Sequence, residues 1–345
     1  MTEGIATPGG GWRRADGPPA ETRGKKRRKG GRRGRGEVAM VDDVEFTSYY
    51  GRPVIKPPVW KSPEVQLYLF FGGASGAAAI LGALGEFTRR PVMTRSAHLF
   101  AGGGALASVG LLIVDLGRPE RFLHMLRVFK PTSPLSVGSY ILSPFSALAV
   151  ATAGLHVLGR WPVLRRLGAV GSAVFAGPLA TYTGVLLANT AVPSWHAAGT
   201  QLPYVFGASG MAAGGGITMA LSPVAEAAPA RRFAVTGAVI ELAYMHKVEN
   251  DHGIVSEPYH EGKAGALLRA AKACTAAGAA VTVAVGRRRA GAVLGGALLA
   301  AGSALTRFGV YEAGMASARD PKYTVVPQRE RLEARKNEHA STITR

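Results

Sequence analysis

The sequence predicts an all-α membrane protein with eight transmembrane helices. Hydrophobic residues make up 47% of the chain and charged residues only 18%, whereas soluble domains carry about 25% charged residues. The apolar residues gather in runs of about 20 residues, the length that crosses a hydrocarbon core of ~30 Å. Glycine accounts for 46 residues and is concentrated in those runs, where small residues let helices approach closely in lipid.

Eight segments are apolar and long enough, or nearly so, to cross a membrane, and a helix satisfies their backbone groups internally. The expected bounds are 65–87, 96–116, 137–159, 167–190, 203–221, 232–249, 264–285 and 290–310. The sixth segment is the weakest, because Glu241 and His246 interrupt it. The small residues of Gly72–Gly76 and Gly291–Gly296 predict helix–helix contact faces rather than phosphate-binding loops, because they lie inside spans.

The chain is expected to have three parts: a basic N-terminal tail over 1–46, a membrane domain over 47–310 and a polar C-terminal tail over 311–345. The net charge is +19, and residues 1–36 hold eleven basic residues against three acidic ones. Such a tail is expected to be disordered. It either contacts anionic lipid or is a solvated extension with no specific role, and nucleic acid is not an expected partner.

The connections between the spans differ in length. Those after the second, fourth and sixth spans are the longer ones and carry most of the polar residues. They lie on the same face as both termini, which makes that face the expected docking surface for a partner. The basic residues of the short connections and those of the N-terminal tail favour opposite orientations in the membrane, so the orientation stays open.

Metal centres built by this chain alone are not expected. The single cysteine, Cys274, allows no disulfide and no iron–sulfur or zinc site made of thiols. His98 and His156 lie in different spans near the face of the short connections, but their spacing does not enforce paired ligation of a haem. We therefore expect surface or packing roles for both. A cleavable signal peptide is not expected either, because the first apolar run begins near residue 65.

An acid and several further charges directly follow the apolar run of the second span. Charges facing lipid cost roughly 2.5–3.5 kcal/mol at a helix centre and less near its end, so this stretch indicates a role at the membrane surface. In one interpretation it forms a polar pocket, with Asp115 carrying a proton and Arg118 or Arg121 donating hydrogen bonds. In the other it ends a helix, with Gly117 as the stop, Pro119 as the breaker and an ion pair across the turn.

Polar residues in two further spans are candidates for the same site. Glu64, Gln66 and Tyr68 occupy the first turns of the first span. Glu64 and Tyr68 share a face because they are four residues apart. These side chains can supply the donors and the proton that a quinone headgroup needs. Tyr182 and Asn189, seven residues apart at the end of the fourth span, are also expected to face one way.

Three stretches of the chain carry a resemblance to a known family. The first is 67–77 in the first span, the second is 115–125, and the third follows the eighth span over 307–329. In this order, they resemble the NrfD-like family, the membrane subunit of polysulfide reductase-type oxidoreductases, over about residues 47–330. The second stretch, Asp-Leu-Gly-Arg-Pro-Glu-Arg-Phe-Leu-His-Met, is the most specific.

The resemblance implies a haem-free protein of two four-helix bundles in the cell (cytoplasmic) membrane. It would exchange electrons between a quinone or quinol, such as menaquinone, and a ferredoxin-like iron–sulfur subunit. That subunit would in turn serve a catalytic subunit, often of the molybdopterin type. The clusters would belong to the partner, and this chain would hold no complete active site alone.

Roles are expected for individual residues, of which that of Tyr182 comes from the resemblance and the others from the residues themselves. Tyr182 corresponds to the quinone-contacting tyrosine of the family, and Asp115 is expected to manage the protons of a bound quinone. The remaining residues expected to contact the headgroup are Glu64, Gln66, Tyr68, Arg118, His124 and Asn189. Where the family has Asn and His near the start of the first span, this chain has Glu64 and Gln66.

Two alternatives stay open. The first is a purely structural membrane anchor, which applies if the replacement of the family's Asn and His by Glu64 and Gln66 has abolished electron exchange with quinone. The second is a proton-translocating module without quinone chemistry, which applies if Glu241, His246 and Glu249 form part of a proton path. These three residues equally fit the end of the sixth helix.

Overall fold

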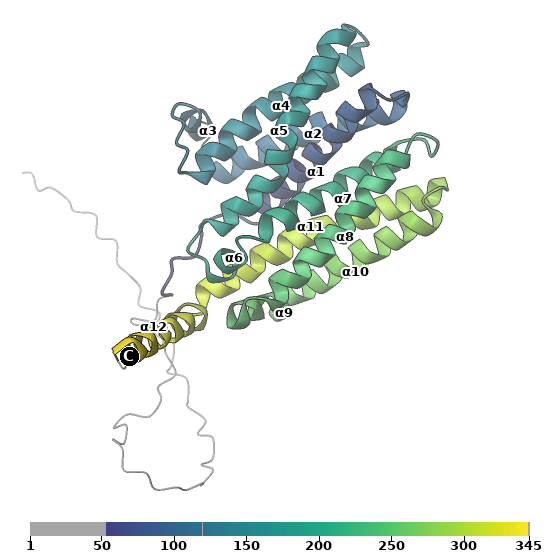
Figure 1. Ribbon diagram of the computed structural model, residues 1–345. Helices are drawn as coiled ribbons and strands as arrows, with labels where there is room; N and C mark the ends of the chain where they lie inside the picture. The colour runs from purple at the N-terminus through teal and green to yellow at the C-terminus, as the bar shows by residue number, and fades with distance from the viewer. Residues whose placement is uncertain (1–52, 119, 344–345) are drawn as a thin grey trace, which may run out of the picture. The chain divides into compact units, whose positions relative to one another are not determined.

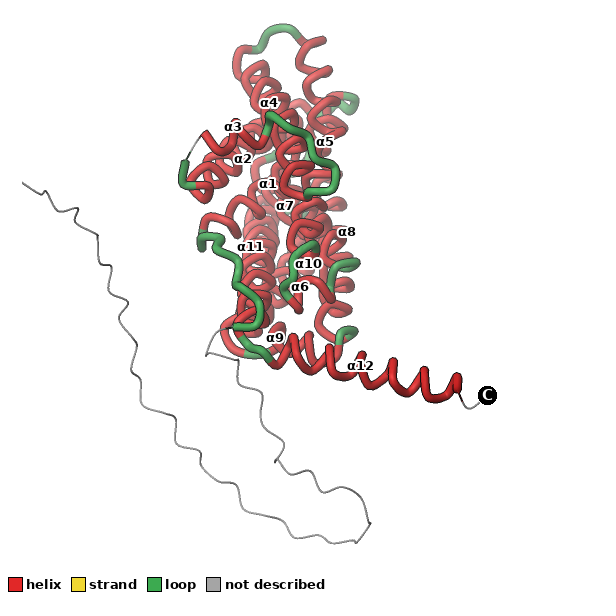
Figure 2. The backbone as a smooth tube through the Cα atoms, turned by 90° about the vertical axis from the view of Figure 1, so that its left-hand side faces the viewer, coloured by secondary structure: helices red, strands yellow, loops and turns green. Residues whose placement is uncertain are grey.

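The structure is a computed structural model that describes residues 53–118 and 120–343, with side chains as far as residue 335. The basic tail expected over 1–46 therefore lies outside the described residues. All regular structure in the described part of the chain is helical, as Figure 2 shows. The all-α class is thus confirmed.

Long helices occupy each of the segments expected to span the membrane (Figure 1). They are α1 (Glu64–Glu86), α2 (Pro91–Leu116), α4 (Pro134–Leu158), α5 (Pro162–Ala188), α7 (Leu202–Leu221), α8 (Ala228–Asn250), α10 (Gly262–Val285) and α11 (Arg289–Arg319). Shorter elements fill the longer connections and the C-terminal region: α3 (Glu120–Met125), α6 (Pro193–Ala197), the 3-10 helix η2 (Gly253–Ser256), α9 (Glu257–His260) and α12 (Lys322–Ile343).

Six of the long helices in the described residues are long and apolar enough to cross a membrane: α1, α2, α4, α5, α10 and α11. The prediction of eight spans is therefore confirmed for six. Helix α7 is diluted by five glycines and by polar residues, and α8 carries several charged residues. Hydropathy alone does not classify these two helices as spans.

Several helix ends differ from their expected positions. Helices α2, α4 and α5 begin at Pro91, Pro134 and Pro162, a few residues earlier than predicted. Proline suits the first helical position, because it has no N–H to leave unpaired and its φ is already helical. Helix α11 continues beyond residue 310 to Arg319. Tyr311 and Ser317 are buried there and Glu312 pairs with Lys263, so the helix continues where the apolar run has ended.

The long helices pack in two groups of four (Figure 1). Helices α1, α2, α4 and α5 contact one another, and α7, α8, α10 and α11 do the same. Helix α7 joins the groups by packing against α1 and α5. Helix α1 is therefore central: it lies within the first group and also contacts α7 and α11 of the second.

Small residues make these contacts, as their spacing predicted. A Cβ atom on Gly210 of α7 would lie 2.9 Å from the carbonyl oxygen of Gly73 in α1. A Cβ on Gly216 would lie 3.1 Å from the carbonyl oxygen of Gly296 in α11. The backbones meet without intervening side chains, which is the packing that small residues allow in membrane proteins.

A buried arginine links three helices at this junction. Arg307 of α11 is 0% exposed. Its Nε donates to the carbonyl oxygen of Leu69 in α1 at 3.2 Å, and its Nη2 donates to that of Phe206 in α7 at 3.1 Å. Its Nη1 donates to Ser209 Oγ at 2.7 Å and to Ser303 Oγ at 2.8 Å. A buried guanidinium that lost these partners would be strongly destabilising.

We expect Gly214→Val to destabilise the protein and Gly103→Val to leave it nearly unchanged. A Cβ on Gly214 would meet the carbonyl oxygen of Ala74 at 2.5 Å and the Cβ of Ala77 at 2.7 Å, whereas a Cβ on Gly103 meets nothing within 4 Å. Overpacking of this kind costs about 1–3 kcal/mol. Thermal unfolding of both variants in detergent measures the difference, and equal melting temperatures would contradict the close α1–α7 contact.

Candidate functional site

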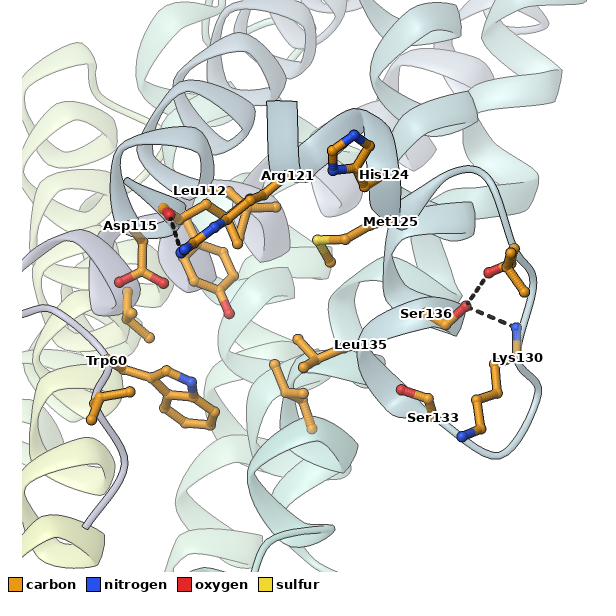
Figure 3. A pocket seen from close by; sticks show the side chains of 16 residues that line it. Trp60, Leu112, Asp115, Arg121, His124, Met125, Lys130, Ser133, Leu135 and Ser136 are labelled. Carbon is orange, nitrogen blue, oxygen red and sulfur yellow. Dashed lines mark hydrogen bonds between the residues drawn. The ribbon is translucent and has the colours of Figure 1, made fainter. Parts of the chain in front are cut away.

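A cleft of about 470 Å³ opens at the polar end of the first helix group (Figure 3). Its walls come from the segment before α1 and from α1, α2, α3, the loop after α3, α4 and α5. The polar side chains that line it are Tyr68, Asp115, Arg121, His124, Lys130, Ser133 and Ser136. Most of the remaining lining is apolar, including Trp60, Leu112 and Leu186. The cleft thus combines apolar walls with a few donors and one carboxylate.

The end of α2 places Asp115 at the cleft. Gly117 adopts a left-handed conformation with φ 73°, and its N–H donates to the carbonyl oxygen of Val114. Glycine adopts this conformation without steric cost, so it ends the helix. The backbone N–H of Lys61 donates to Asp115 Oδ1 at 2.9 Å, and Lys61 Nζ donates to the carbonyl oxygen of Val114 at 3.1 Å. Within the described part of the chain, the other carboxylate oxygen, Oδ2, accepts no hydrogen bond.

The helix-end interpretation of this stretch is partly correct. Gly117 is the stop, as predicted, while Pro119 lies outside the described residues. The bond that crosses the turn is not the expected ion pair between side chains. Instead, Arg121 Nη1 donates to the backbone carbonyl oxygen of Leu116 at 3.0 Å. The stretch therefore ends a helix, and two of its side chains, Asp115 and Arg121, also line the cleft.

Two tyrosines approach the same place. Tyr68 of α1 is 6% exposed, and its side chain lines the cleft. Asp115 lines the same cleft, and Tyr182 of α5 lies one helical turn before Leu186, which lines it as well. The ring of Tyr182 packs on Gly138 of α4, where any Cβ atom would overlap it. Tyr182 does not itself line the cleft but lies next to a residue that does.

An aromatic cluster fixes one wall of the cleft. Trp60 stacks on Trp195 with ring centroids 5.6 Å apart, and Figure 3 shows the Trp60 ring below Asp115 and Arg121. The hydroxyl of Tyr311 donates to the carbonyl oxygen of Trp60 at 2.9 Å, and Trp195 Nε1 donates to that of Val310 at 2.7 Å. The segment before α1 is thus tied to α11.

Besides Tyr182, four residues predicted for the site do not line the cleft. Gln66 is buried, and its Nε2 donates to Ser62 Oγ at 2.9 Å, so it holds the turn before α1. Glu64 lies in the first turn of α1 but outside the cleft lining. Arg118 and Asn189 are exposed, and Asn189 caps the end of α5. His124 does line the cleft, from α3.

The loop after α3 contributes residues that the sequence did not reveal. The N–H of Lys130 donates to Ser136 Oγ at 2.9 Å, and the hydroxyl of Tyr140 donates to the carbonyl oxygen of Leu126 at 2.8 Å. These bonds fold the loop onto the start of α4 and bring Ser133 and Ser136 to the cleft. The path of a loop depends on such contacts, and the hydrophobic periodicity of a sequence does not predict it.

The ionisable residues of α8 separate into different environments. Glu241 is 2% exposed and accepts a hydrogen bond from Thr306 Oγ1 at 2.7 Å. Glu249 pairs with Lys272 at 2.7 Å. His246 is exposed and contacts Asn250. Their contacts do not join the three into one path.

The long apolar helices define the chain as a multi-pass membrane protein. The polysulfide reductase family model of the NrfD type matches residues 46–319. The chain therefore belongs to the NrfD-type polysulfide reductase family, whose members are membrane subunits of oxidoreductase complexes. Such subunits typically associate with iron–sulfur and molybdenum catalytic subunits. A comparison with curated proteins gives no significant match.

We expect Asp115→Ala to lower the stability of the protein by about 1 kcal/mol, the usual net value of one hydrogen bond. The Lys61 N–H would lose its acceptor. Asp115→Asn keeps a side-chain oxygen as acceptor and should cost much less. Thermal unfolding of the two variants measures the difference. If both variants melt together with the wild type, the bond between Lys61 and Asp115 does not hold the segment before α1.

Proposed function

We propose that this chain is the quinone-reactive subunit of its oxidoreductase complex and that the quinone binds in the cleft beside Asp115 and Tyr68. One observation carries the proposal: a cleft of about 470 Å³ with apolar walls has a carboxylate and a phenol at its polar end. A quinone headgroup is an apolar ring with two carbonyl oxygens. Small-molecule sites typically have such volumes, apolar walls and a few placed polar groups.

The reaction requires two electrons and two protons. Oxidation of a quinol to a quinone releases both electrons to the iron–sulfur partner and both protons to acceptors at the site; quinone reduction is the reverse. Asp115 Oδ2 accepts one proton in this proposal, because Oδ1 is held by the Lys61 N–H, and the second proton passes to solvent at the open end of the cleft. The Tyr68 hydroxyl hydrogen-bonds one oxygen of the headgroup, and Arg121 and His124 supply further donors. The adjacent Tyr182 positions the Tyr68 ring.

We also propose that α7 and α8 cross the membrane, which gives eight spans in two four-helix bundles. Both helices pack along α10 or α11, which are apolar enough to span. The charged groups of α8 are compensated where they are buried: Glu241 by Thr306 and Glu249 by Lys272. Paired polar groups facing a bundle interior are compatible with a membrane span. The cell membrane is the proposed location.

The partner subunits dock, we propose, on the end that carries α3, α6, α9 and α12. The contacts Lys263–Glu312 at 2.7 Å and Lys322–Glu257 join the C-terminal region to the connection around α9 on this end. The cleft opens at the same end of α1, so an electron leaving the headgroup has a short route to a docked iron–sulfur subunit. In this proposal the clusters belong to that ferredoxin-like partner, a molybdopterin-type subunit performs the catalysis, and this chain carries no haem.

We expect Asp115→Asn to weaken binding of a quinone analogue to the purified complex by about tenfold, the value of one charge-assisted hydrogen bond. Tyr68→Phe should have a similar effect, and Tyr182→Phe a smaller one. Asp251→Asn, on an exposed connection, is the control and should bind as wild type. Fluorescence titration with a naphthoquinone analogue and quinol oxidation by the assembled complex are the measurements.

The same preparation distinguishes the alternatives. If wild-type complex assembles on membranes but exchanges no electrons with quinol, the chain is a structural anchor. If the purified chain conducts protons in liposomes without redox partners, it is a proton-translocating module. Unchanged analogue binding in both Asp115→Asn and Tyr68→Phe would place the quinone elsewhere.

A further inference from the structure

A second cluster of ionisable side chains lies at the opposite end of the first helix group. It joins Glu86 at the end of α1, His98 of α2 and His156 of α4. The Nε2 atom of His156 is 3.0 Å from Glu86 Oε1, and that of His98 is 4.0 Å from the same oxygen. One ligand atom from each of the three residues lies within 4.8 Å of the other two.

The cluster is built into the helix packing. The side chains of His98, His156 and Glu86 are 0%, 7% and 3% exposed. Both ring nitrogens of His98 are buried, and within the described residues the only polar group that approaches them, apart from Glu86 and His156, is the backbone of Gly82. A Cβ on Gly82 would lie 2.6 Å from the His98 ring, so this position leaves room for the imidazole. Buried polar atoms normally have partners, and a buried imidazole facing a carboxylate needs an explanation.

We propose that Glu86, His98 and His156 bind a divalent transition-metal ion of the zinc class. Two imidazole nitrogens and one carboxylate oxygen are a common protein ligand set for Zn²⁺. Bond lengths of about 2.0–2.1 Å in a tetrahedral site place ligand atoms about 3.3 Å apart. The separations of 3.0 and 4.0 Å bracket that value. Small side-chain rotations would bring the three atoms around one ion.

The surroundings define the rest of the site. Arg165 donates to both carboxylate oxygens of Glu86, from Nε to Oε1 at 3.0 Å and from Nη2 to Oε2 at 3.1 Å. The ion would therefore bind the remaining lone pair of Oε1, while Oε2 keeps its partner. Residues orienting a ligand in this way are usual around metal sites. An open cleft of about 460 Å³ adjoins the cluster and is lined by Arg89, Arg90 and Arg95. Its positive charge favours a water-derived hydroxide or another anion as the fourth ligand.

This arrangement does not suit a haem. The two imidazole rings stack with centroids 5.0 Å apart, and both Nε2 atoms lie near one carboxylate oxygen. Axial ligation needs the two rings on opposite faces of a porphyrin, and no macrocycle fits between rings in this contact. Of the two roles expected for His98 and His156, burial excludes the surface role and agrees with packing.

The proposed metal site is independent of the quinone cleft. Tyr68 and Glu86 lie 18 residues apart on α1, which is about 27 Å along the helix. Binding would connect α1, α2 and α4 and stabilise the folded state by a free energy that grows with the logarithm of the ion concentration above Kd. Failure of the quinone proposal would leave the metal proposal intact, and the reverse also holds.

The test is Zn²⁺ binding to the full chain, purified in detergent with a tag that lacks histidine. After treatment with a chelator, the protein is titrated with Zn²⁺ and with Co²⁺, and metal content and melting temperature are measured. We expect one ion per chain, a higher melting temperature with Zn²⁺ and the intense visible absorption of four-coordinate cobalt. His98→Gln, His156→Gln and Glu86→Gln should each weaken binding by at least about tenfold.

His246→Gln is the matched control, because His246 is exposed on α8, and it should bind metal as wild type. If a variant of one of the three metal ligands fails to fold, the cobalt spectrum and the metal stoichiometry of the wild type still show whether the site binds an ion. Absence of saturable binding by the wild type would overturn the proposal. So would binding that the three ligand variants leave unchanged, or binding that is lost equally in His246→Gln.

Discussion

The buried guanidinium of Arg307 is the interaction on which the arrangement of the helices depends. It donates to backbone oxygens of α1 and α7 and to two serine hydroxyls, one on α7 and one on α11. A charge taken out of water is costly unless every donor is used, so the three helices must present these acceptors together. Gly73 leaves the space: a Cβ there would lie 2.8 Å from Arg307 Nη2. The contact between the two helix groups is thereby fixed.

Arg307 also links the packing to the proposed function. Its bond to the carbonyl oxygen of Leu69 holds α1 one residue from Tyr68. Ser108 of α2 donates to the carbonyl oxygen of Tyr68 at 3.1 Å, so α1 is held on both sides at this level. The segment before α1 is held by Lys61 at Asp115 and by Tyr311 at Trp60. A cleft built on such fixed elements needs little rearrangement to bind a flat ring.

The sequence predicted what depends on local pattern. Long apolar runs located the helices, and Gly117 located the end of α2. The 115–125 stretch indicated a polar site at the membrane surface, and Asp115, Tyr68 and His124 do line one cleft. The prolines at the starts of α2, α4 and α5 were present in the sequence as helix-start signals, but apolarity alone set the predicted bounds.

Other features depend on contacts between distant residues, which periodicity does not encode. Gln66 faces Ser62 rather than the cleft, and spacing along a helix does not say which neighbour a side chain meets. The loop that brings Ser136 to the cleft is directed by its own hydrogen bonds. The cluster of Glu86, His98 and His156 draws on three helices, so it becomes visible only when these are packed.

The most direct measurement is photo-crosslinking of the membrane-embedded complex with an azido-quinone, followed by mass spectrometry of the labelled peptides. We expect the label on residues 59–68 and 112–136, which form most of the cleft lining, and competition by excess unlabelled quinone. Specific labelling confined to α7, α8, α10 or α11, or to the end of α1 near Glu86, would contradict a quinone site beside Asp115.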